Sequence, residues 1–233
     1  MITKRETALR NIREWDPRVS QWSEKLRADK ELMLEAVKYD GLYLQYASEA
    51  LQGDKEVVLA AVDNRGCSLD YASKALQNNK EVVLAAVSNN GNALQFASEM
   101  LKNDKEIVLA AVRSDGYSLE YASERLKNDK QIVLAAVRYD GCSLQYASKT
   151  LKNDREVAIT AIRNEGTALQ FASKELRADR ELVLVAVKRD GDALEIVSDE
   201  FKNDKHVVLT AIEQNPDAIK YASPEMKKLL SRS

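Results

Sequence analysis

Apolar residues recur along this chain at a fixed interval of 25 residues. Counting repeat positions 1 to 25 from Asp54, a typical copy has an apolar run at positions 4 to 9, a glycine at 13, a leucine at 16 and Ala-Ser at 19 and 20. Such a period is typical of repeat proteins, in which one supersecondary unit stacks on copies of itself. The pattern therefore predicts a repeat architecture over nearly the entire chain.

The first half of each copy predicts a helix, because it is rich in Ala, Leu, Glu and Lys. The copy that contains Asn103, Asp104 and Glu106 shows the expected start signal. Asn is expected to cap free amides, Asp favours the positive helix end, and Glu three residues after Asn completes a capping box. The glycine at position 13, such as Gly66, is expected to end the helix, since only glycine takes the left-handed conformation without strain.

The second half of each copy predicts another helix, starting at position 14 or 15. Copies with a capping serine at position 15, such as Ser118, have none at 14, whereas copies with Ala93 or its equivalents carry a capping residue such as Asn92. The stripe at positions 16, 19, 20 and 23 then follows the spacing of one helix face. We expect the recurring serine at position 20 to lie in that stripe and to bond the carbonyl four residues back.

Neither short helix buries its apolar surface alone, so stacking must complete the core. We expect an all-α fold, a monomeric α-solenoid of about nine helix-turn-helix repeats of 25 residues. Asp16-Pro17 and Pro216 replace the glycine in atypical terminal copies, as expected of caps. The single domain, 1–233, would consist of a degenerate N-terminal capping repeat (1–28), seven regular repeats (29–203) and a C-terminal capping repeat (204–233).

Composition narrows the classes of partner and compartment. Lys plus Arg number 35 against 37 Asp plus Glu, so there is no basic excess to favour nucleic acid or a membrane surface. No apolar run approaches the roughly 18–20 residues of a membrane span, and the N-terminus lacks the apolar stretch of a secretory signal. Cys67 and Cys142 share one repeat position three copies apart and are expected to be free thiols. These features favour the cytoplasm, or a host cytosol if the chain belongs to a secreted effector.

The residues offer little for catalysis. His206 is the only histidine and occupies position 3, where other copies have Glu or Gln, so we expect it to be exposed. One histidine and two distant cysteines do not provide a zinc site or a catalytic triad, and no Walker, Rossmann or kinase motif occurs. We expect no enzyme activity, no catalytic residue, no metal and no cofactor.

Charged residues on the first helix suggest a binding surface instead. The cations at positions 2 and 24 interleave with acids at 1 and 3, which predicts a solvated, self-neutralising ridge. Positions 3, 7 and 10 share another face, where a mostly small residue at 7 would let a partner backbone approach between opposite charges. The alternative is that these charges merely complement the helix dipole. The candidate partner-binding residues are Glu106, Arg113, Arg138, Glu156, Arg163 and Lys188.

The phrase D-[KR]-E-[VL]-V-L-x-A-V-x-x-[DN]-G-x-x-L-[QE]-[YF]-A-S-x-x-L, from Asp29 to about Ser223, resembles the tandem-repeat family catalogued as domain of unknown function 4116. The resemblance implies a helical repeat module, often attached to other domains, and carries no catalytic residues. We expect a protein-binding scaffold. The alternatives are a spacer or regulatory arm of a larger protein and, less favoured at a pI near 5.7, binding of an anionic partner such as RNA or lipid headgroups.

Overall fold

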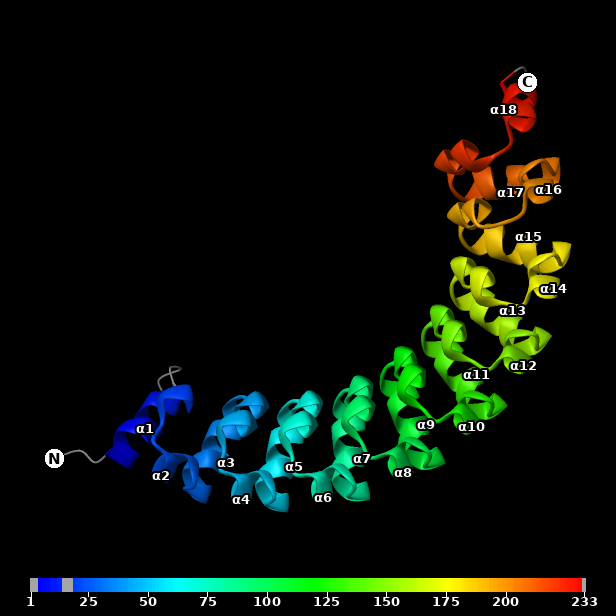
Figure 1. The fold of residues 1–233 in the computed structure, drawn as a ribbon. Helices are drawn as coiled ribbons and strands as arrows, with labels where there is room; N and C mark the ends of the chain where they lie inside the picture. Colours follow the sequence, from blue (N-terminus) through cyan, green and yellow to red (C-terminus); the bar gives the residue numbers. More distant parts are fainter. Residues whose placement is uncertain (1–3, 14–18, 232–233) are drawn as a thin grey trace. The chain divides into compact units, whose positions relative to one another are not determined.

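The computed structural model describes residues 4–13 and 19–231, and every regular element in these ranges is an α-helix or a 3₁₀ helix (Figure 1). Asp16 and Pro17 lie outside the described residues. The chain divides into two compact units, a first unit (1–123) and a second unit (124–233). The expectation of one continuous domain stays a prediction. None of the described helices combines the length and the apolar character that a membrane crossing requires.

Each full repeat contains three elements in a fixed order: a long α-helix, a 3₁₀ helix and a short α-helix. In the first unit these are α1 (Lys4–Arg13), η1 (Val19–Gln21), α2 (Glu24–Arg27), α3 (Lys30–Tyr39), η2 (Gly41–Tyr46), α4 (Glu49–Gln52), α5 (Lys55–Asn64), η3 (Gly66–Tyr71), α6 (Lys74–Gln77), α7 (Lys80–Asn89), η4 (Gly91–Phe96), α8 (Glu99–Lys102), α9 (Lys105–Ser114) and η5 (Gly116–Tyr121).

The second unit continues the same order. Its elements are α10 (Glu124–Lys127), α11 (Lys130–Tyr139), η6 (Gly141–Tyr146), α12 (Lys149–Lys152), α13 (Arg155–Asn164), η7 (Gly166–Phe171), α14 (Lys174–Arg177), α15 (Arg180–Arg189), η8 (Gly191–Glu195), α16 (Asp199–Lys202), α17 (Lys205–Gln214), η9 (Pro216–Tyr221) and α18 (Pro224–Leu230). In each unit the long helices pack side by side in chain order (Figure 1). This serial packing confirms the predicted all-α solenoid class.

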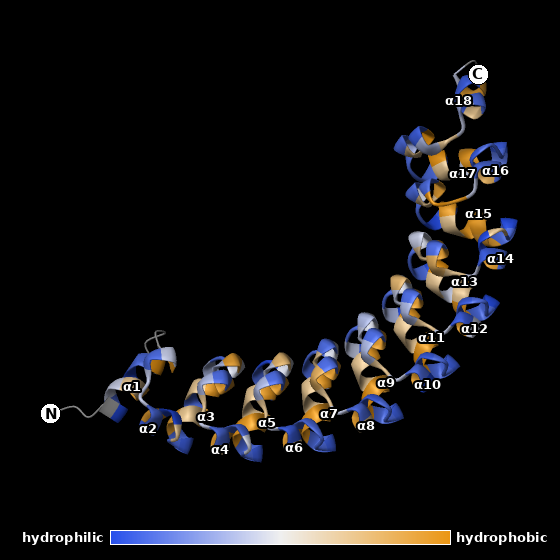
Figure 2. Ribbon diagram, in the orientation of Figure 1, coloured by the Kyte–Doolittle hydropathy of each residue, from blue (hydrophilic) through white to orange (hydrophobic). Residues whose placement is uncertain are grey.

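The core lies between these layers. Long-helix positions 4, 5, 8 and 9 are buried in nearly every full copy, and the leucine at position 16 of most 3₁₀ helices joins them. In α15, for example, Leu182, Val183, Ala186 and Val187 are fully buried, and Leu194 of η8 packs in the same cluster. Figure 2 shows the apolar residues where the elements of a unit face one another and hydrophilic residues on the outer turns of the short helices. Stacking therefore buries what one repeat leaves open, as expected for a solenoid.

The start of the long helix differs from the prediction by one residue. Asp104 is the N-cap of α9, in extended geometry, and its carboxylate accepts hydrogen bonds from the amides of Glu106 and Ile107 at 2.9 and 3.2 Å. Asn103 instead ends α8, and its side-chain oxygen accepts a bond from the Ser123 hydroxyl. The predicted Asn cap with a Glu capping box is therefore wrong, because Asp at position 1 already satisfies the free amides.

The glycine at position 13 is needed for a different reason than predicted. The helix α5 ends at Asn64, its C-cap residue Arg65 is extended, and Gly66 opens η3 with no left-handed φ. A Cβ on Gly66 would lie 2.3 Å from the carbonyl oxygen of Ala86 in the next long helix and 3.0 Å from Asn90. The expectation of a left-handed cap is wrong. Close approach of the neighbouring repeat excludes a side chain here.

The predicted second helix is two short pieces. In the repeat of α9, η5 ends before Ala122, which is extended, and α10 follows. The 3₁₀ helix is capped from position 12, where the Asp115 carboxylate accepts from the Tyr117 amide at 2.9 Å. Ser118, predicted as a cap, is fully buried. The expectation of a cap at position 14 or 15 is therefore wrong, although Leu119 and Leu126 both reach the core as the stripe predicted.

The recurring serine at position 20 precedes each short helix, and in four copies, those of Ser98, Ser148, Ser173 and Ser223, its hydroxyl caps that helix. The Ser148 hydroxyl accepts a bond from the Leu151 amide and donates to Asn128, and its backbone amide donates to the carbonyl of Lys127. Ser148 forms no bond to the carbonyl four residues back, so the expectation is wrong for this described copy. The extended residue before Ser148 turns the serine away from helical geometry and frees it for capping.

Candidate partner-binding surface

Two edges of the long-helix face carry the predicted binding residues. One edge lies at the N-terminus of each long helix, at repeat positions 1 to 3, and the other lies near its C-terminus, at position 10. Seven residues separate positions 3 and 10, a rise of about 10.5 Å along a helix. The charged side chains at these two edges differ in whether they form ion pairs with neighbouring repeats.

At the N-terminal edge, charges pair across repeats. The Lys130 ammonium of α11 lies 2.7 Å from the Asp154 carboxylate and 2.9 Å from that of Glu156, both at the start of α13. The Lys80 ammonium contacts Asp104 and Glu106 in the same way, at 2.8 Å each. We call this series the ion-pair ladder. Its other described rungs join Arg5 to Asp29 and Glu31, Lys30 to Asp54 and Glu56, Lys55 to Glu81, Arg155 to Asp179 and Glu181, and Arg180 to Asp204.

The ladder changes the acid–base properties of its members. The hydrogen bond from Lys130 lowers the pKa of the Asp154 carboxyl, and the Asp154 carboxylate in turn raises the pKa of Lys130. The same reciprocal shifts occur for Asp104, whose pKa falls, and Lys80, whose pKa rises. Each of these aspartates also caps its own long helix, which stabilises the ionised form further.

Two of the six candidate residues belong to this ladder. Glu106 and Glu156 each pair with the position-2 lysine of the preceding repeat, although both side chains remain more than 60 % exposed, at 64 % and 62 %. The predicted self-neutralising ridge forms at positions 1 to 3, whereas the position-24 cation Lys102 pairs with Glu99 of its own short helix at 2.8 Å. That Glu106 and Glu156 also bind a partner stays a prediction. Their carboxylates already serve to connect neighbouring repeats.

At the C-terminal edge the four candidate cations are unpaired. Arg113, Arg138, Arg163 and Lys188 are exposed, and none forms an ion pair or a side-chain hydrogen bond with any residue in 4–13 or 19–231. Arg113 lies on α9 in the first unit, and the other three lie on α11, α13 and α15 in the second unit. These cations also complement the negative ends of their helices. That interaction leaves their hydrogen-bond donors open to a partner.

Backbone contacts place three of these cations in a column. The Asn164 side chain accepts from the Gly141 amide at 3.2 Å and donates to the carbonyl of Arg138 at 2.8 Å. One repeat later, the Arg189 guanidinium donates to the carbonyl of Arg163 at 3.0 Å. The C-terminal ends of α11, α13 and α15 therefore lie in register. We call Arg138, Arg163 and Lys188 the cation column, which is followed on α17 by the exposed Glu213.

The first unit has no such uniform series. Its long helices α3, α5, α7 and α9 carry Lys38, Asp63, Ser88 and Arg113 at position 10. Lys38 moreover contacts Glu35 of its own helix, at 3.5 Å. Position 10 is therefore mixed in charge in the first unit and cationic in three consecutive helices of the second.

The surface between the two edges is open and partly apolar. Position 7 carries Ala135, Thr160 and Val185, all half-buried. A shallow groove of about 510 Å³ runs between α15 and α17, and its lining is Leu184, Lys188, His206, Thr210, Glu213 and Gln214. His206 is exposed, as predicted, and its Nδ1 atom lies 3.4 Å from the Arg180 guanidinium. A partner on this face would meet small or aliphatic side chains between opposite charges.

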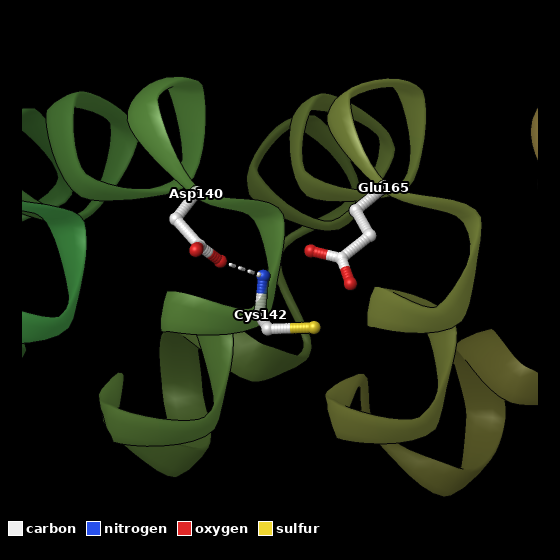
Figure 3. Close-up of side chains that lie close together, drawn as sticks. All are labelled: Asp140, Cys142 and Glu165. Carbon is white, nitrogen blue, oxygen red and sulfur yellow. Dashed lines mark hydrogen bonds between the residues drawn. The ribbon is translucent and has the colours of Figure 1, made fainter.

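A second cluster, which sequence reasoning missed, joins Asp140, Cys142 and Glu165 (Figure 3). One potential ligand atom from each lies within 4.8 Å of the others. Burial, together with the hydrogen bond and charge of Glu165, raises the pKa of Cys142 to about 12. The thiol is therefore protonated near neutral pH, whereas a metal requires the thiolate.

The carboxylates of this cluster have structural partners. Asp140 caps η6 by accepting from the Cys142 amide at 2.9 Å, and Glu165 accepts from the Thr167 hydroxyl at 3.0 Å. The cluster joins positions 12 and 14 of one repeat to position 12 of the next. Because its residues are not close together in the sequence, no sequence motif indicates the cluster. Cys142 and Cys67 are both free thiols, as predicted.

The repeat unit matches a known protein family over most of the chain. Four segments match the family described as "Domain of unknown function (DUF4116)", namely residues 29–77, 79–127, 129–177 and 179–227. The chain belongs to this family. Each matched segment spans two of the 25-residue copies and thus two long helices. No curated protein and no solved structure matches the chain.

Within the DUF4116 segments, structural and surface positions behave differently. Position 8 is alanine in all eight long helices from α3 to α17, and these residues are fully buried. Position 10 is Lys, Asp, Ser, Arg, Arg, Arg, Lys and Glu in the same helices. The repeat thus fixes the contacts that stack it and leaves the chemistry of the C-terminal edge free to vary.

Proposed function

We propose that this chain is a non-catalytic scaffold for protein–protein interaction, and that its long-helix face binds the partner. The observation that carries the proposal is the unpaired cation column on a surface where the neighbouring ladder charges are paired. Exposed cations that contribute no contact to the fold are available to a ligand. Arginine is also enriched among the residues that dominate protein interfaces.

The repeat architecture supports a macromolecular partner rather than a small substrate. A stack of long helices offers an extended surface. The residues at its exposed positions can vary while the core residues stay the same. The groove beside α15 is shallow and lined by few apolar groups, unlike the concave, mostly apolar sites that hold small molecules. We further propose that the chain acts as a monomer in the cytoplasm, for which its two free thiols are suitable.

Photo-crosslinking from the two sides of one repeat tests this function. A benzophenone amino acid at Gln131, on the proposed face, is compared with the same residue at Thr150, on the short helix α12. Both native residues are uncharged, exposed and in the second unit. Incubation with lysate of the source cells should yield a discrete crosslinked protein from position 131 and not from 150.

Charge reversal gives the matching control. The crosslink from position 131 should disappear when Arg138 and Arg163 are changed to glutamate, with the helical circular dichroism unchanged. Equal crosslinking from both positions, or none from position 131, would contradict a partner-binding role for this face.

A further inference from the structure

We propose that the cation column binds an acidic polyproline II segment with a carboxylate at every third residue, followed three residues later by a cation. The proposal rests on the proposed scaffold function and names its partner chemistry. Arg138, Arg163 and Lys188 would each face one carboxylate, and Glu213 would face the cation. The segment would run across α11, α13, α15 and α17, roughly perpendicular to their axes.

The spacing expected between neighbouring packed helices favours this conformation. Neighbouring packed helices lie about 8–10 Å apart. A polyproline II chain rises about 3.1 Å per residue with three residues per turn, so every third side chain returns to the same side after about 9 Å. In a β-strand, by contrast, side chains three apart point to opposite faces. Every third residue of a polyproline II segment can therefore face the position-10 side chain of the next helix in the stack.

The width of the face also favours a slender ligand. Only about 10.5 Å of helix separates the cation column from the position-3 carboxylates of the ladder. A helical ligand, with a diameter of about 10–12 Å, would cover both edges and place its charges against Glu156 and Glu181. Tyr139, which is 57 % exposed next to Arg138, adds an aromatic side chain of the kind that contacts prolines in other recognition grooves.

The electrostatics favour a peptide over a polyanion. The rung formed by Lys130 sets one cation against two carboxylates, so its net charge is +1 − 2 = −1. The same holds for the rung of Arg155 with Asp179 and Glu181. RNA or an anionic membrane lying on this face would meet that negative edge, whereas a peptide presents carboxylates only where the column is positive.

Glu213 gives the site a direction and a specificity. It interrupts the column at the fourth helix with a side chain of opposite sign, and no ion pair with another described residue neutralises it. A ligand with a fourth carboxylate would meet like charge there, and one with a lysine would meet its complement. The order of charges thus distinguishes this surface from a general attraction for acidic chains.

Fluorescence anisotropy with labelled peptides tests the proposal on the full chain. The probe is E-P-P-E-P-P-E-P-P-K, compared with E-P-P-E-P-P-E-P-P-E and with a scrambled peptide of the probe's composition. We expect the probe to bind on the order of tenfold more tightly than either control at low salt. Equal affinity for the probe and the scrambled peptide would overturn the proposal.

Variants of the chain locate the site. Arg138→Glu with Arg163→Glu should abolish probe binding, whereas Lys149→Glu with Lys174→Glu, exposed lysines of short helices in the same unit, should retain it. Both pairs change the net charge equally. Glu213→Lys should invert the preference, so that the all-glutamate peptide binds better. Absence of this inversion would contradict the assigned direction.

Two competing ligands are distinguished in the same assay. Tighter binding of oligouridylate than of the probe would assign the column to nucleic acid. Tighter binding of a helical peptide with glutamates seven residues apart would replace the polyproline II geometry. If no peptide binds while Gln131 still crosslinks a protein, the scaffold function stands and this partner chemistry is wrong.

Discussion

The two charged edges of the long helices have the same kinds of residue but different roles. At the N-terminal edge, Lys130 reaches Asp154 and Glu156 of the following repeat. At the C-terminal edge, Arg138 contributes only its backbone carbonyl to the neighbouring repeat and leaves its guanidinium unpaired. A charge in a repeat protein is thus structural when its partner lies one period away, and a candidate for recognition when the adjacent repeat offers it nothing.

The largest effect should come from breaking the close approach that aligns both edges. Gly66→Ala places a Cβ 2.3 Å from a backbone oxygen of the next repeat, and we expect the unfolding free energy to fall by about 1–3 kcal/mol. Gly53→Ala is the matched control, because its nearest neighbour would lie 3.5 Å away and its φ of −96° suits alanine. Urea unfolding measures both, and equal destabilisation would contradict the explanation of the position-13 glycine.

A second pair of variants should show that the ion-pair ladder contributes to stability and that the cation column does not. Asp154→Asn keeps an N-cap, as Asn79 does naturally, but removes the charge that Lys130 contacts. We expect a loss of about 0.2–1 kcal/mol, typical of exposed ion pairs. Arg138→Gln should leave the urea midpoint unchanged. Comparable losses from both would mean that the two edges do not differ in structural role.

Acid should weaken the ladder and leave the column charged. The pKa values of Asp54, Asp104 and Asp154 are lowered in the folded chain, first by the hydrogen bonds from the position-2 lysines. Their contribution is therefore complete above the unfolded pKa of about 3.9 and is lost as pH falls through the lower folded values. Unfolding midpoints measured from pH 6 to pH 2 should decline below about pH 4. The decline should be smaller with all three changed to Asn.

The smallest effect concerns the partly buried cluster of Asp140, Cys142 and Glu165 in Figure 3. Burial and Glu165 keep Cys142 protonated, and burial also raises the pKa of the more accessible Cys67. A thiol reagent at pH 8 should modify Cys67 before Cys142, and zinc should leave the melting temperature unchanged. A zinc-dependent increase in melting temperature that is lost with Cys142→Ser would assign the cluster to a metal.

Periodicity was sufficient to predict the solenoid class, the long helices and the free thiols. It did not predict the division of the second helix, because both Ser148 and the residues around it are compatible with a continuous α-helix. At the break, the Ser148 amide donates to the carbonyl of Lys127 in the preceding repeat, as the Ser48 amide does to Arg27, and the Ser148 hydroxyl also bonds Asn128. Local propensity contains no information about such neighbours.

The candidate site was predicted only in part, because its ion pairs also depend on residues of neighbouring repeats. The run of cations at position 10 was visible in the sequence, and the structure brings Arg138, Arg163 and Lys188 into one register. The ion pairs of Glu106 and Glu156 were not predicted, because the position-2 lysines find their acceptors 24 and 26 residues further along the chain. Once the repeats are known to stack in register, those offsets identify the ladder from the sequence alone.

The most direct test of the difference between the two edges measures both the affinity for the probe peptide and the urea midpoint in each of two variants. We expect the Asp154→Asn variant to have a lower urea midpoint and to bind E-P-P-E-P-P-E-P-P-K like the parent chain. We expect the variant with Arg138→Gln and Arg163→Gln to keep the parent's urea midpoint and to lose affinity for the peptide. Parallel changes of affinity and stability in either variant would contradict that difference.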